Sequence, residues 1–114
     1  MARSLMQDED RDFLTSENVR LELLPKPTHE NRRAEVDFYN AHFNTATSEP
    51  FSDELGKAAL VLAKKYGLAA GDALNLASAI RQEADEFYTS EKHGKPMFRV
   101  KELRVISIHG LKVD

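Results

Sequence analysis

Three carboxylates occupy positions from which acidic side chains could act on one substrate. Glu22 lies in an expected helix that follows a short strand, Asp72 begins another helix, and Glu91 follows another strand. Helix starts and strand ends meet at one edge of an open parallel sheet, so we expect these acids to lie close together. Carboxylate oxygens are the ligands that Mg²⁺ and Mn²⁺ prefer. Such ions can activate water and stabilise the charge that develops in phosphodiester cleavage.

Each acid also has an ordinary structural interpretation. The helix dipole favours an acid such as Asp72 at a helix start, Glu22 could lie on a solvated helix face, and Glu91 could belong to a polar turn. Three polar residues are candidates for the surroundings of the site. They are Ser16, Asn75 and Thr89. A serine before a helix can alternatively serve as its cap, and a threonine after a strand can simply end it.

Strand and helix patterns alternate along the chain. The expected strands are 13–15, 86–89 and 103–108, with a short edge strand within 45–51, and the expected helices are 16–24, 28–43, 52–66 and 72–81. Ser16, Thr28 and Ser52 are the expected helix caps, and Pro25 and Pro27 should end the first helix. The alternation predicts an α/β three-layer sandwich with a mainly parallel sheet, as a single domain over 1–114.

The overall charge of the chain favours no particular class of partner. The net charge is −3 at neutral pH, so nucleic-acid binding would need a local basic patch. Lys26, Arg32 and Arg33 are the candidates, and the alternative is a solvated helix face. The sequence contains no cysteine, which excludes disulfides and thiolate zinc sites. No signal-like or membrane-spanning apolar run is present, so we expect a cytoplasmic protein without membrane contact.

Two segments carry a family resemblance. GDALNLASAIRQEADEFYTSE begins at Gly71 and places acids 19 residues apart (91 − 72 = 19), and FLTSENVRLELL begins at Phe13 and places Ser six residues before Glu (22 − 16 = 6). In these motifs, over about residues 13–108, the chain resembles the PIN domains, which include the VapC-type ribonuclease toxins. One departure is that the last acid of that family is usually Asp, whereas this chain has Glu91.

The resemblance implies a Mg²⁺- or Mn²⁺-dependent endoribonuclease that acts on single-stranded RNA. An antitoxin-like protein is the partner that it implies. The implied roles are metal binding and catalysis for Glu22, Asp72 and Glu91. Ser16, Asn75 and Thr89 are the candidates for support of this site, and Lys26, Arg32 and Arg33 are the candidates for contact with RNA phosphates.

The start of the chain departs from the family pattern. PIN domains begin with a hydrophobic strand that ends in a catalytic Asp, and the twelve residues before Phe13 show no such strand. We therefore expect an N-terminally truncated PIN-like domain that is weakly active or inactive. A missing central strand would leave two open sheet edges, which favours a homodimer. The alternatives are a non-catalytic, partner-binding or self-associating module derived from a PIN domain, and an unrelated small α/β domain.

Overall fold

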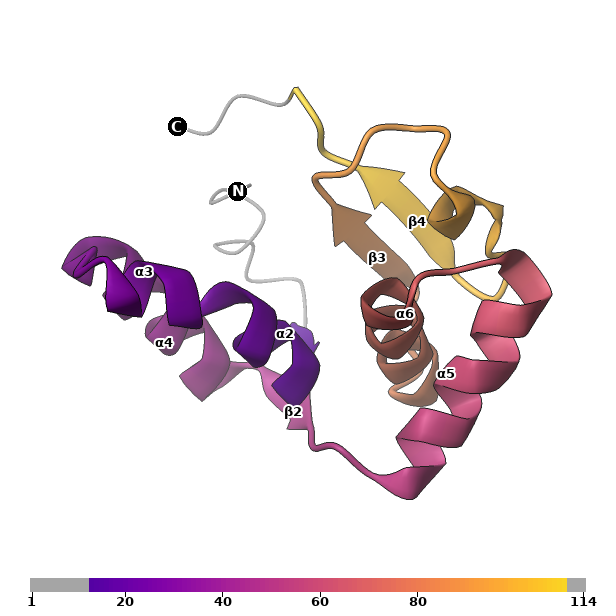
Figure 1. Cartoon of the computed structure of the whole chain (residues 1–114), viewed down its shortest axis with the longest axis horizontal. Helices are drawn as coiled ribbons and strands as arrows, with labels where there is room; N and C mark the ends of the chain where they lie inside the picture. The colour runs from indigo at the N-terminus through magenta and orange to yellow at the C-terminus, as the bar shows by residue number, and fades with distance from the viewer. Residues whose placement is uncertain (1–12, 111–114) are drawn as a thin grey trace.

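The computed structural model describes residues 13–110, which form a mixed α/β structure (Figure 1). The predicted absence of a strand before Phe13 lies outside the described residues. The elements in chain order are β1 (Leu14–Ser16), α2 (Glu17–Leu23), α3 (Pro25–His29), α4 (Arg33–Thr45), β2 (Thr47–Glu49), α5 (Asp53–Tyr66), α6 (Ala70–Arg81), β3 (Glu86–Thr89), the 3-10 helix η1 (Pro96–Arg99) and β4 (Arg104–Ser107).

The strands form two parallel pairs. β1 lies beside β2 with Leu14 opposite Thr47, and β3 lies beside β4 with Glu86 opposite Arg104. The α/β class and the parallel pairing are therefore confirmed. Within residues 13–110 the strands make two two-stranded sheets, where the sequence predicted one sheet in a three-layer sandwich. Which strands join into a sheet depends on long-range pairing, and local sequence patterns do not determine that pairing.

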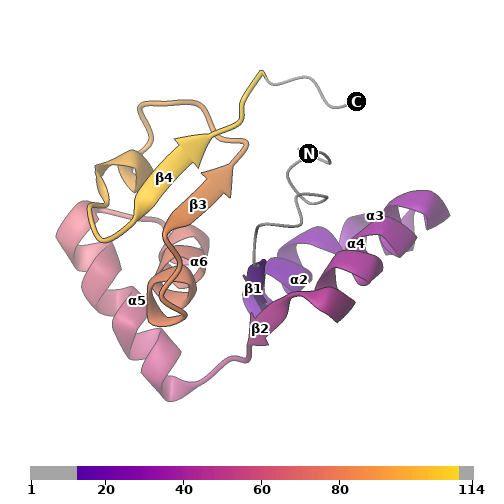
Figure 2. The ribbon, with the colours of Figure 1, turned by 180° about the vertical axis from the view of Figure 1, so that it is seen from behind.

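The apolar core lies between α5 and α6 and extends to the β3–β4 pair, which lies next to these helices (Figure 2). Its buried members are Leu55, Ala59, Leu62, Ala73, Leu76, Ala77, Met97, Val100 and Leu103. Phe87 and Val105 on β3 and β4 pack against this cluster. The core stripe of α5 follows helical spacing, as the sequence predicted.

The two ends of α5 confirm the predicted capping signals. The Ser52 hydroxyl accepts a hydrogen bond from the Leu55 N–H at 3.1 Å, which satisfies one free donor of the first turn. Gly67 ends the helix with a φ of 71°, in the left-handed region that suits glycine. Only Leu68 and Ala69 then separate Gly67 from α6, so the two helices fold back on each other.

The prediction for residues 25–32 was wrong in part. The first helix does end before Pro25, since α2 runs from Glu17 to Leu23, but Pro25 is the first residue of a short helix, α3, that the sequence did not predict. Proline fits that position, since the first N–H of a helix has no partner within the helix. Thr28 lies inside α3, and its hydroxyl donates to the Leu24 carbonyl at 2.7 Å. The next helix, α4, begins at Arg33 without a side-chain cap.

Side chains at the end of α6 connect it to the β1–β2 pair. The Gln82 amide donates to the Thr15 carbonyl at 2.8 Å, and Arg81 forms an ion pair with Glu49 at 2.7 Å. These contacts hold the first half of the chain against the helix that carries Asp72. Among the helices of residues 13–110, none has the length and apolarity needed to cross a membrane.

Candidate acidic site

Helix α2 carries Glu22 and begins at a well-defined cap. The Ser16 hydroxyl accepts from the Val19 N–H at 3.3 Å, and only 1% of the Ser16 surface is exposed. Ser16 is therefore a helix cap, as one of its two interpretations predicted. Six residues later, on a helix that contacts α6, the Glu22 side chain is exposed to solvent.

The first turn of α6 carries Asp72 and lies next to Glu22. Its N-cap residue, Ala69, provides no side-chain hydrogen bond. A Cβ atom added to Gly71 would lie 2.8 Å from the Glu22 Oε2 atom. The carboxylate of α2 therefore reaches the first turn of α6, and Glu22 and Asp72 are neighbours, although fifty residues separate them in sequence (72 − 22 = 50).

Two asparagines link Glu22 to the body of the protein. The Asn75 Nδ2 group donates to Glu22 Oε1 at 2.8 Å, and the Asn18 Nδ2 group donates to Asn75 Oδ1 at 2.8 Å. Asn75 was predicted to support the site. Asn18, which is 7% exposed, was missed by the sequence analysis. Its signal was an amide side chain one helical turn before Glu22 (22 − 18 = 4) on the same helix face.

Glu91 follows β3, and its backbone is held by two hydroxyl groups. The Thr89 Oγ1 atom accepts from the Glu91 N–H at 3.2 Å, and the Ser107 hydroxyl donates to the Glu91 carbonyl at 2.7 Å. The Glu91 side chain itself is exposed. Thr89 thus supports the segment that carries Glu91, while Ser107 on β4 was not singled out from the sequence.

The charges of the three acids act on one another at Asp72. Partial burial raises the pKa of the Asp72 carboxyl, and the nearby charges of Glu91 and Glu22 raise this pKa further. Lys95 acts in the opposite direction and lowers the Asp72 pKa. The Asp72 carboxyl is therefore within reach of the charges of both other acids.

Glu22, Asp72 and Glu91 provide carboxylate oxygens of the kind that bind a hard cation, but the three side chains do not surround a common binding position. Among residues 13–110, no group of three or more His, Cys, Asp or Glu side chains is arranged to hold a metal ion. Carboxylate oxygens do suit Mg²⁺ and Mn²⁺. No family model, curated protein or solved structure matches this chain.

Of the three predicted basic residues, Lys26 lies in the first turn of α3, and Arg32 and Arg33 lie at the start of α4. Lys26 and Arg33 are exposed, whereas Arg32 forms ion pairs with Glu30 at 2.9 Å and with Glu35 at 3.1 Å. In Figure 1 the α3–α4 junction lies at the end of the molecule remote from α5.

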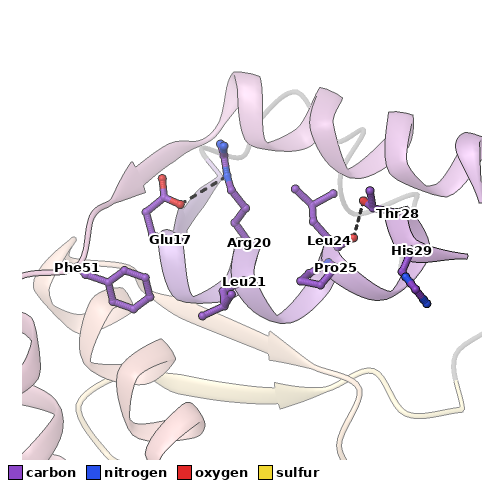
Figure 3. A pocket seen from close by; sticks show the side chains of 8 residues that line it. All are labelled: Glu17, Arg20, Leu21, Leu24, Pro25, Thr28, His29 and Phe51. Atoms are coloured by element: carbon purple, nitrogen blue, oxygen red, sulfur yellow. Dashed lines mark hydrogen bonds and ion pairs between the residues drawn. The ribbon is translucent and has the colours of Figure 1, made fainter. Parts of the chain in front are cut away.

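An open, largely apolar groove of about 520 Å³ runs along α2 and α3 (Figure 3). Its lining residues are Glu17, Arg20, Leu21, Leu24, Pro25, Thr28, His29 and Phe51. Leu21 is 61% exposed and Phe51 is 52% exposed. These two side chains give the groove an exposed apolar surface.

Proposed function

We propose that the chain is a PIN-like domain that binds single-stranded RNA and a divalent cation and cleaves RNA weakly or not at all. The observation that carries the proposal is the proximity of Glu22 and Glu91 to Asp72, whose pKa they raise. These acids come from α2, from the segment after β3, and from α6. The parallel pairing of β1 with β2 and of β3 with β4 supports the α/β class.

The ion would be held by Glu22, Asp72 and Glu91. Mg²⁺ or Mn²⁺ would supply an activated water and would stabilise the charge that develops on the phosphodiester. Burial is the first cause of the raised pKa of Asp72, and the charges of Glu91 and Glu22 add to it; a cation would relieve that added repulsion. Glu22 and Glu91 have exposed side chains that can turn toward an ion. The family resemblance implies one further Asp, so three acids alone give weak ion binding and slow cleavage.

The proposed RNA contact uses the basic residues of α3 and of the start of α4. Lys26 and Arg33 are exposed cations that could meet phosphates, while Arg32 is already paired with two acids. Binding through two or three phosphates would be modest. The logarithm of its affinity would fall with the logarithm of salt concentration, with a slope of about −0.7 per phosphate contact for a single strand.

The test compares Asp72→Asn with Asp37→Asn, a control on the exposed face of α4. We expect calorimetry to show Mn²⁺ binding by the wild-type chain and by Asp37→Asn, and at least tenfold weaker binding by Asp72→Asn. Any slow cleavage of a single-stranded RNA in Mn²⁺ should disappear in Asp72→Asn alone. A wild-type chain that binds neither Mn²⁺ nor RNA would overturn the proposal.

The apolar groove favours a second candidate, a self-associating module without catalysis. Leu21 and Phe51 expose apolar surface beside Leu24 and Pro25, and a second copy of this chain could cover that surface. Sedimentation should then show a dimer that Leu21→Asn weakens and that Leu60→Asn leaves intact. Leu60 is a matched control because it is 55% exposed on α5 and lies outside the groove. A monomer at all concentrations would exclude this candidate, and an antitoxin-like partner would then have to be sought.

A further inference from the structure

We infer that Gly71 is a positioning residue for the acidic site, because its missing side chain leaves the space into which the Glu22 carboxylate fits. The inference rests on the proposed function only for the role of that carboxylate. Gly71 itself needs no special backbone conformation, since it is a helical residue in the first turn of α6. The glycine therefore matters because it leaves free space beside its Cα atom.

The Glu22 carboxylate occupies the space in which a side chain of residue 71 would begin. The position of a Cβ on Gly71 lies 2.8 Å from Glu22 Oε2, a separation that real side chains do not adopt, and 3.9 Å from the Glu22 Cδ atom. The atom in the way belongs to the end of a flexible side chain. Any other residue at position 71 would therefore leave the helix intact and move the carboxylate.

The other oxygen of the same carboxylate is held by α6. Glu22 Oε1 accepts from Asn75 at 2.8 Å, and Asn75 is oriented in turn by the buried Asn18. One oxygen of Glu22 is therefore held by a hydrogen bond from α6, and the other lies in the space that Gly71 leaves open. Since Asp72 directly follows Gly71, this arrangement keeps the two acids together.

The arrangement also suits the charge of Glu22. The first turn of α6 has no side-chain cap, and the N-terminal end of a helix attracts a negative charge. A carboxylate from α2 at this place favours the helix, while its like charge acts on Asp72. Gly71 allows the close approach that both effects require.

The test compares Gly71→Ala with Gly56→Ala. Gly56 is a matched control, because it lies inside α5 and a Cβ there would meet nothing within 4 Å. Alanine forms helices better than glycine, so both variants should melt at or above the temperature of the wild-type chain. In Gly71→Ala alone, we expect the side-chain amide signals of Asn75 and Asn18 to move in nuclear magnetic resonance spectra. We also expect Mn²⁺ affinity to fall about tenfold in that variant, as is typical when the support of a metal ligand is lost.

Unchanged Asn75 amide signals in a folded Gly71→Ala variant would overturn the inference. Glu22→Ala provides a second variant, because it removes the carboxylate and must also move those signals if the contact exists. If the wild-type chain binds no Mn²⁺, the proposed function fails, while the amide signals still decide the role of Gly71. If Mn²⁺ binds equally to the wild-type and Gly71→Ala chains, the function stands and the positioning role fails.

Discussion

The two halves of the molecule are stabilised in different ways. From α5 onward, nine buried apolar residues form one continuous cluster. Before α5, among the described residues, the buried apolar residues are Phe43 and Pro27, and the remaining buried side chains are the polar ones of Thr15, Ser16 and Asn18. The second half is therefore held by hydrophobic burial, and the first half depends more on hydrogen bonds and on its contacts with α6.

This difference shows where the acidic site obtains its rigidity. Asp72 lies on α6, which belongs to the apolar core, whereas Glu22 lies on α2 in the polar half. The site therefore spans a stable and a less stable region. Regions with few buried apolar contacts open locally at lower free-energy cost than the core does, so we expect Glu22 to be the more mobile of these two acids.

The largest expected effect comes from a cavity in the apolar core. Leu76 on α6 is fully buried, and Leu76→Ala should lower the free energy of unfolding by about 2–5 kcal/mol. Urea denaturation followed by circular dichroism would measure this loss. The control is Leu21→Ala, an exposed leucine of the polar half, for which we expect a change within about 0.5 kcal/mol. Equal losses would contradict the contrast between the halves.

A smaller effect comes from the two serine caps, one in each half. Ser52→Ala and Ser16→Ala each remove a hydroxyl that accepts a helix N–H, at a cost of about 1 kcal/mol. Hydrogen exchange would distinguish their consequences. Ser16→Ala should speed exchange mainly in α2, while Ser52→Ala should lower protection throughout α5 and α6. Similar exchange patterns in the two variants would indicate one cooperative unit instead of two.

The smallest effect concerns the pH dependence of stability. Burial and the charges of Glu91 and Glu22 raise the pKa of Asp72 above its unfolded value, so the folded chain holds this proton more tightly. Its contribution to stability is present below the unfolded pKa and is lost as the pH rises through the folded pKa. Asp72→Asn should therefore be the more stable chain near pH 7, by less than about 1 kcal/mol because the site is open to solvent. Urea denaturation near pH 4 and near pH 7 would measure the difference, and greater stability of the wild-type chain near pH 7 would contradict it.

Local signals predicted much of the fold. The strand at Glu86–Thr89 and the helix between Ser52 and Gly67 follow from alternation, capping and a glycine stop. The short helix α3 was missed because proline both ends one helix and begins another. Local sequence does not distinguish these two roles, since the surrounding packing decides between them.

The candidate site was predicted less completely than the fold. Glu22, Asp72 and Glu91 were expected to be neighbours from the order of helices and strands, and the pKa of Asp72 reflects the other two charges. Asn18 and Gly71 were not assigned to the site. Their roles depend on how closely α2 approaches α6, and that distance is a property of tertiary packing.

The contact between Gln82 and Thr15 has a consequence for protein synthesis. These residues are 67 positions apart, and a ribosome adds roughly 5–20 residues per second. We therefore expect roughly 3–13 s to pass between the synthesis of β1 and that of its partner on α6. Docking of the nascent first half must wait until the helix that receives it has left the ribosome.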